Sequence, residues 1–162
     1  SNLYKILKKN LTSKKFITLS IISNNQVSKQ IKELIKLNDL EIKIYEKVSN
    51  LKTRFMGDCD VVFSVGYLKK IETEIINNFE IINLHPSLLP KYKGLMTHKR
   101  MLINNEIKYG YSIHKVTKYL DDGEILSQNQ KKVSTSSETE LSTDHKHLEH
   151  QKVFKDLVNF LN

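Results

Sequence analysis

The segment Ile81-Ile-Asn-Leu-His-Pro-Ser-Leu-Leu-Pro-Lys-Tyr-Lys-Gly94 contains the pattern that decides the fold. Its first part, Ile81 to His85, has the composition of a buried strand, in which alternate side chains share one face. Asn83 and His85 are therefore expected to project together from the carboxyl end of this strand. Pro86 has no backbone N–H and favours an extended residue before it, so the strand is predicted to end there.

The segments on either side alternate between strand-like and helix-like hydrophobic patterns. The expected strands are residues 16–22, 41–45, 60–65, 81–85, 109–116 and 125–133. The expected helices are residues 3–11, 27–35, 71–79, one that Thr97 would cap, and one at the end of the chain. Residues 134–144 are predicted to be a polar linker. This alternation predicts an α/β fold with a doubly wound, Rossmann-like, mostly parallel sheet and antiparallel C-terminal strands. Ligands of such sheets bind outside the carboxyl ends of the strands.

Composition excludes several classes of protein. The 162 residues, 39% hydrophobic and 27% charged, suit one folded domain with a core. The net charge of +8 comes from lysines spread along the chain, with no basic block among aromatics, so we expect no nucleic-acid surface. Cys59 is the only cysteine, which excludes a disulfide framework and a cysteine-based metal cluster. Without a signal peptide or an apolar run of about 18 residues, the prediction is a cytoplasmic protein without a membrane span.

The polar residues at the end of the central strand suggest acyl-group chemistry. Asn83 is an uncharged donor, and His85 can donate or exchange a proton near neutral pH. An aspartate brought opposite them could orient the imidazole and relay protons through water. Such a trio suits attack of an amine on a carbonyl, because the oxyanion that forms needs donors. From the residues alone, a satisfied polar pair at a strand end and a simple turn at Asp121 remain open alternatives.

Further stretches extend this pattern along the chain. They are Asn83-Leu-His-Pro-Ser-Leu-Leu-Pro-Lys-Tyr-Lys-Gly94, Leu95-Met-Thr-His98, Ser112-Ile-His114-Lys-Val-Thr117, Leu120-Asp-Asp-Gly123 and Gln128. Together they resemble the formyltransferases that use 10-formyltetrahydrofolate, most closely the phosphoribosylglycinamide formyltransferases. The resemblance implies an enzyme of de novo purine (IMP) biosynthesis that transfers the formyl group of 10-formyltetrahydrofolate to the amine of glycinamide ribonucleotide.

The resemblance also implies a role for particular residues. Asn83 and His85 would bind and polarise the formyl oxygen, and Asp121 would pair with His85 and help to move protons. The implied folate-binding residues are Tyr67, Leu68, Lys69, Ile71, Val116, Thr117 and Leu120, and the implied acceptor-binding residues are Ser1, Asn2 and Glu149. The expected partner is a small phosphoribosyl amine, with no metal, nucleic acid or membrane, and the chain is expected to act as a monomer or homodimer.

The sequence departs from the family at its start. Family members open with a buried strand and a Gly-rich loop, and this sequence begins after both. A single formyltransferase domain over residues 1–162 is therefore expected to lack its first strand. Two alternatives stay open: a formyltransferase that acts on an amino-sugar nucleotide or a methionyl-tRNA, and a truncated folate-binding protein without catalysis.

The remaining histidines are assigned supporting roles. His98 and His114 are predicted to be structural or to support the site from behind. His145, His147 and His150 have a spacing that resembles a metal site, but their polar surroundings predict a solvated helix face.

Overall fold

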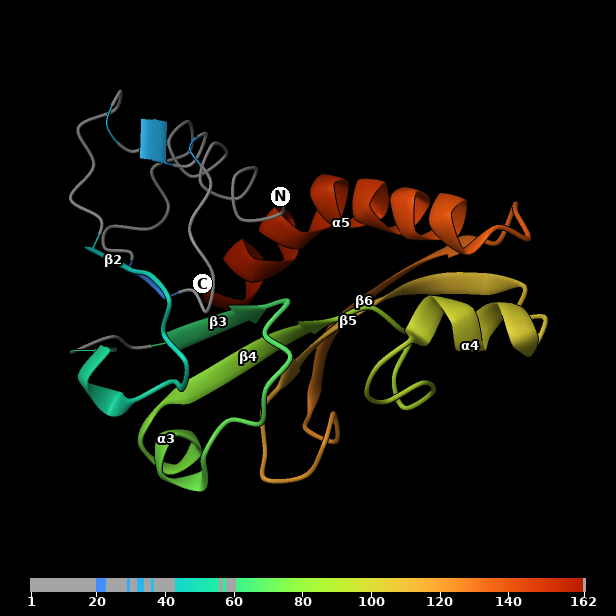
Figure 1. Cartoon of the computed structure of the whole chain (residues 1–162). Helices are drawn as coiled ribbons and strands as arrows, with labels where there is room; N and C mark the ends of the chain where they lie inside the picture. The colour runs from blue at the N-terminus through green and yellow to red at the C-terminus, as the bar shows by residue number, and fades with distance from the viewer. Residues whose placement is uncertain are drawn as a thin grey trace. The chain divides into compact units, whose positions relative to one another are not determined.

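A computed structural model describes residues 20–22, 29, 32, 33, 36, 43–55, 57 and 61–161 (Figure 1). The chain divides into two compact units, with the boundary between Cys59 and Asp60. The helix predicted at residues 3–11 and the expected loss of a first strand lie outside the described residues. In the described part, no helix has the length and apolar character needed to cross a membrane.

The first unit contains a pair of short parallel strands. β1 (Ser20–Ile22) and β2 (Lys43–Tyr45) pair in parallel, and a short 3-10 helix, η1 (Thr53–Phe55), follows them. The residues described between the two strands are helical at positions 29, 32, 33 and 36. Parallel neighbours need a crossover connection, which is commonly helical. The strand–helix–strand order predicted for this region is therefore confirmed where the structure describes it.

The second unit contains a four-stranded sheet in the order β3-β4-β5-β6. β3 (Val61–Val65) and β4 (Glu80–His85) are parallel, whereas β5 (Lys108–Lys115) and β6 (Ile125–Lys132) are each antiparallel to the preceding strand. The helices are α3 (Thr73–Asn78), α4 (Thr97–Ile103) and α5 (Glu138–Leu161). The predicted α/β fold, with parallel pairs first and antiparallel strands last, is confirmed.

The central sheet has one apolar face and one polar face. In the β4–β5 ladder, Asn83 lies opposite His114 and His85 opposite Ser112. Residues opposite each other on neighbouring strands share a face, so these four polar side chains point the same way. The alternate residues are apolar and buried, among them Ile82, Leu84, Tyr111 and Ile113. These residues face α5, and the hydroxyl of Tyr111 donates to Asp156 Oδ2 of that helix at 2.6 Å. The polar side chains therefore lie on the face of the sheet that points away from α5.

Two local predictions were wrong. Thr97 is the first residue of α4 and not its cap, because Met96 precedes it in a left-handed conformation (φ 57°) and no side chain caps the helix. Residues 134–144 are not all linker, since α5 begins at Glu138. The hydroxyl of Ser137 accepts the N–H of Glu140 at 3.4 Å, and Leu141 is fully buried in the first turns of α5.

Candidate active site

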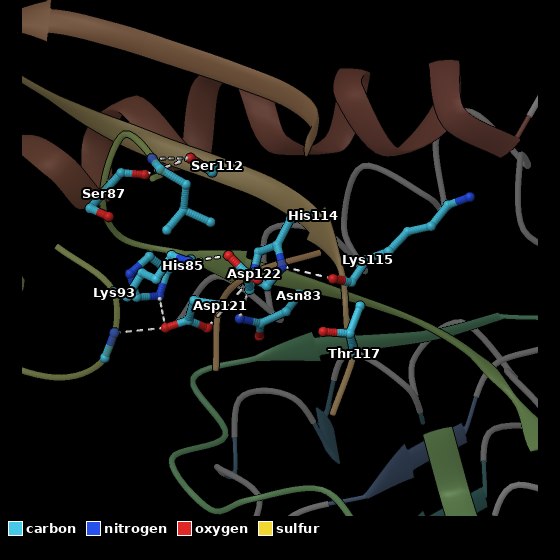
Figure 2. Close-up of polar contacts among 12 residues, drawn as sticks. Asn83, His85, Ser87, Lys93, Ser112, His114, Lys115, Thr117, Asp121 and Asp122 are labelled. Atoms are coloured by element: carbon cyan, nitrogen blue, oxygen red, sulfur yellow. Dashed lines mark hydrogen bonds and ion pairs between the residues drawn. The ribbon is translucent and has the colours of Figure 1, made fainter. Parts of the chain in front are cut away.

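The carboxylate of Asp121, in the loop between β5 and β6, lies against two histidine rings (Figure 2). Its Oδ2 is 3.4 Å from His85 Nδ1, and its Oδ1 is 3.6 Å from His114 Nε2. The backbone N–H of Gly94 donates to Oδ2 at 2.7 Å. The predicted convergence of His85 and Asp121 is therefore confirmed as geometry, and His114 joins them.

His114 holds the amide of Asn83. His114 Nδ1 lies 2.8 Å from the carbonyl oxygen of Lys115, so this nitrogen carries the proton. Nε2 then accepts from Asn83 Nδ2, at 3.3 Å. Burial lowers the pKa of His114, which favours the neutral ring that this arrangement needs. The support role predicted for His114 is thus a specific one: it fixes the orientation of the Asn83 amide.

The buried ring of His85 presents its Nδ1 to Asp121. Its Nε2 lies 2.9 Å from the carbonyl oxygen of Tyr92, and a carbonyl only accepts, so Nε2 carries a proton. Nδ1 is therefore the nitrogen that can gain or lose a proton. A proton placed there lies between the imidazole and the Asp121 carboxylate, where both groups stabilise it.

The loop that follows His85 is organised by Ser112, which is completely buried on the polar face of β5. Its hydroxyl donates to the carbonyl oxygen of Ser87 at 2.7 Å and accepts the N–H of Leu89 at 2.9 Å. Gln128 Nε2 contacts both Ser112 Oγ and the carbonyl oxygen of Leu89 at 2.8 Å. One hydroxyl thus satisfies backbone groups on two residues of the loop that carries Tyr92 and Gly94 to the site.

Replacing Ser112 by alanine is expected to lower the free energy of unfolding by about 2 kcal/mol or more. The change leaves the N–H of Leu89 and the carbonyl of Ser87 without this partner, and each buried polar group that loses its partner costs about 1–3 kcal/mol. Urea unfolding of both proteins would measure the difference. Ser136→Ala, an exposed serine, serves as the control and should change stability by less than about 0.5 kcal/mol. Equal stability of the two variants would contradict the role of Ser112.

The loop that carries Asp121 is closely packed at Gly123. A Cβ atom at this position would lie 1.8 Å from the carbonyl oxygen of Lys115, so only glycine fits. Asp121 itself has a positive φ of 46°. The next residue, Asp122, forms an ion pair with Lys93, the neighbour of Gly94 (Figure 2). The two loops are therefore joined at two adjacent points, one at Asp121 and one at Asp122.

The residues predicted to bind folate lie on two loops of the second unit. After β3, Tyr67 is half-buried, Leu68 and Lys69 are exposed and Ile71 is buried; between β5 and β6, Val116 and Thr117 are half-buried and Leu120 is exposed. Leu68 and Leu120 expose 74% and 69% of their surface, which leaves apolar area available to a ligand. Their role in folate binding stays a prediction.

The acceptor-binding predictions fall partly outside the described residues. Ser1 and Asn2 are not described, whereas Glu149 is buried on α5. Its Oε1 lies 3.8 Å from His145 Nε2, within one turn of the helix. The role of Glu149 in acceptor binding also stays a prediction.

The prediction of a solvated face for His145 is wrong, although His147 is exposed as expected. His145 is 1% exposed, and its Nδ1 lies 2.6 Å from His98 Nε2 on α4. Leu141, His145 and Leu148 are spaced to share one face of the helix, and this spacing could have indicated that His145 is buried. The polar residues around His145 in the sequence obscured the pattern. Among the described residues, no group of three or more histidine, cysteine or acidic side chains is arranged to hold a metal ion.

Comparison with known proteins identifies the family of the chain. The model of a family described as "Formyl transferase" matches residues 19–157, and the chain belongs to this family. The phosphoribosylglycinamide formyltransferase of Escherichia coli (strain K12) is 39% identical over 71 residues, which are 43% of this chain and 34% of that protein. The bifunctional polymyxin resistance protein ArnA of Wigglesworthia glossinidia brevipalpis is 33% identical over 119 residues, 72% of this chain and 17% of that protein.

A solved structure of similar fold is the phosphoribosylglycinamide formyltransferase from Campylobacter jejuni, with a TM-score of 0.82 and 23% identity over 100% of this chain and 92% of that one. The enzyme of that name from Coxiella burnetii has a TM-score of 0.80 and 26% identity over 98% and 81% of the two chains. The fold of the family is thus present, whereas the stretches matched in the curated relatives span about a third or less of their length.

Proposed function

We propose that the chain transfers the formyl group of 10-formyltetrahydrofolate to the primary amine of glycinamide ribonucleotide, a step of purine biosynthesis. The observation that carries the proposal is the Asp121 carboxylate, held by Gly94 between His85 and His114 and adjacent to the Asn83 amide. Donors for an oxyanion and a carboxylate for protons lie together on one face of the sheet. Amine attack on a formyl carbon requires both.

Each group has a defined task in the reaction. The amine forms a bond to the formyl carbon, and the formyl oxygen becomes an oxyanion. Asn83 donates to this oxygen with the amide N–H that it does not give to His114, and His85 polarises the oxygen from the same face of the sheet. Asp121 assists removal of the proton that the amine loses. The C–N10 bond then breaks, N10 of the folate takes up a proton, and a formamide and tetrahydrofolate are the products.

Pre-organisation of the donors supports this mechanism. His114 is neutral and accepts from Asn83, so the amide is oriented before any substrate binds. His85 is held by the carbonyl of Tyr92, which fixes Nε2 as a donor and directs Nδ1 toward the carboxylate. Donors that need no reorganisation stabilise a developing charge more strongly than mobile ones do.

The identity of the acceptor is the finer part of the proposal. The Gly-Leu-Met-Thr-His run at residues 94–98 and the carboxylate of Glu149 support a phosphoribosyl acceptor. A second candidate is methionyl-tRNA, because the methionyl-tRNA formyltransferase of Thermosipho melanesiensis is 36% identical over 98 residues, 60% of this chain and 29% of that protein. The chemistry at Asn83, His85 and Asp121 is the same for both acceptors.

A direct assay distinguishes these acceptors. The purified natural protein would be incubated with 10-formyltetrahydrofolate in three separate reactions, one each with glycinamide ribonucleotide, an amino-sugar nucleotide and methionyl-tRNA. The formylated product would be measured in each reaction. We expect product with glycinamide ribonucleotide at a rate at least tenfold above the others. A preference for another acceptor would overturn the acceptor assignment only. Folate binding without transfer to any of the three would overturn the enzymatic proposal.

A further inference from the structure

The interface between α4 and α5 contains a buried ring nitrogen that needs a physical explanation. His145 lies on the buried stripe of α5, and within the described part of the chain its Nε2 has no hydrogen-bond partner. A buried polar atom without a partner costs about 1–3 kcal/mol. The edge of the ring packs near Tyr109, with ring centroids 5.7 Å apart. A leucine at this position would avoid the cost, so packing alone does not account for histidine.

The contact between His145 and His98 determines where the protons lie. Their ring nitrogens are 2.6 Å apart, so one ring donates to the other. Burial, followed by the charges of His98 and His85, lowers the pKa of His145 to about 3, and burial also lowers the pKa of His98. Both rings are therefore neutral near pH 7. Each ring then carries one proton, and two tautomeric arrangements are available.

Glu149 favours one of these arrangements. Its Oε1 lies 3.8 Å from His145 Nε2, one helical turn along α5. The bare Nε2 of His114 lies near a carboxylate as well, but there it accepts from Asn83. No described donor reaches His145 Nε2, so a bare lone pair there would be repelled by the carboxylate without compensation, whereas an N–H would be attracted. His98 Nε2 therefore donates to His145 Nδ1, and His145 carries its proton on Nε2. The result is a chain of donors directed from α4 to the Glu149 carboxylate.

We propose that His145 is a positioning residue for acceptor binding, which orients the Glu149 carboxylate through its Nε2–H. This inference rests on the proposed function, in which the Glu149 carboxylate helps to bind a phosphoribosyl acceptor. A carboxylate on a flexible side chain loses rotamer entropy when it binds a ligand. The His98–His145 pair restricts Glu149 in advance, so the acceptor meets a carboxylate that is already oriented.

The kinetic test uses two substitutions of the same residue. His145→Leu removes the donor and keeps an apolar filler, whereas His145→Gln keeps an N–H donor at a similar reach. We expect His145→Leu to raise the KM for the acceptor by about tenfold or more, with kcat and the KM for folate within about twofold of the natural protein. His145→Gln should recover most of the affinity. His147→Leu, on the exposed side of the same helix, is the control and should change none of these constants.

A double-mutant cycle tests whether His145 acts through Glu149. In a Glu149→Gln background, His145→Leu should have little further effect on the KM for the acceptor. Equal effects of His145→Leu in both backgrounds would overturn the proposal. So would a variant whose thermal stability falls while the KM for the acceptor stays unchanged, because that result indicates packing alone.

The tautomer of His145 gives a test that needs no activity. Nitrogen-15 NMR of the imidazole rings in the full chain distinguishes Nδ1–H from Nε2–H. We expect His145 to be neutral and protonated on Nε2, with His98 also protonated on Nε2. A proton on His145 Nδ1 would overturn the inference. If the natural protein transfers no formyl group, the proposed function fails, and the NMR result still decides whether His145 directs an N–H toward the Glu149 carboxylate.

Discussion

Replacement of Asp121 by asparagine is expected to lower turnover by on the order of a hundredfold or more while the protein stays folded. Asparagine keeps the size of the side chain and can still accept the N–H of Gly94. It removes the charge that lies 3.4 Å from His85 Nδ1 and 3.6 Å from His114 Nε2. The protonated form of His85 loses its counter-charge, and no carboxylate remains to assist the amine proton. Steady-state turnover and thermal unfolding would be measured together.

A matched control for this change is Glu124→Gln, a second carboxylate-to-amide substitution in the same loop. Glu124 is exposed and pairs with Lys115 at 3.0 Å, an interaction that contributes little at the surface. We expect its turnover to stay within about twofold of the natural protein. Near-normal turnover of the Asp121 variant would remove Asp121 from the mechanism. Loss of the folded state would show instead that Asp121 is needed for the loop itself.

Substitution of Gly123 by alanine is expected to lower turnover by roughly tenfold to a hundredfold, although residue 123 carries no reactive group. The added Cβ would lie 1.8 Å from the carbonyl oxygen of Lys115, which belongs to the backbone and cannot swing away. The loop must therefore shift, and the carboxylate of Asp121 moves with it. A displacement of about 1 Å can reduce a rate by on the order of a hundredfold. Turnover with saturating substrates would measure the effect.

Gly57→Ala separates this displacement from simple backbone strain. Gly57 has a positive φ of 55°, and no atom lies within 4 Å of a Cβ built there. Its substitution is expected to cost about 1 kcal/mol of stability, with turnover unchanged. If Gly123→Ala retained full turnover, the position of the Asp121 loop would not depend on its contact with β5.

The elements nearest the site were predictable because their determinants are local. Alternation along residues 81–85 placed Asn83 and His85 on one face, and the structure confirms this arrangement. The pairing of His85 with Asp121 could be predicted only through the family resemblance, since nothing local connects a strand end to a distant loop. The specific task of His114 could not be predicted, because it depends on which carbonyl its Nδ1 meets after folding.

The errors have a physical cause as well. Periodicity identifies helices by their apolar stripe, and α5 places a histidine on that stripe between Leu141 and Leu148. His145 therefore made the first turns resemble a linker, and only the partner ring on α4 reveals why a polar residue is buried there. At Thr97, the left-handed backbone of Met96 gave α4 a start that side-chain preferences do not encode.

The double attachment between the loop after β4 and the loop before β6 limits how this protein can be re-engineered. Gly94 binds Asp121 and Lys93 binds Asp122, so a library that varies one loop alone changes the shape of the other. Selections for a new acceptor should randomise residues 92–96 and 119–123 in the same clones. Beneficial changes in one segment are expected to appear with compensating changes in the other.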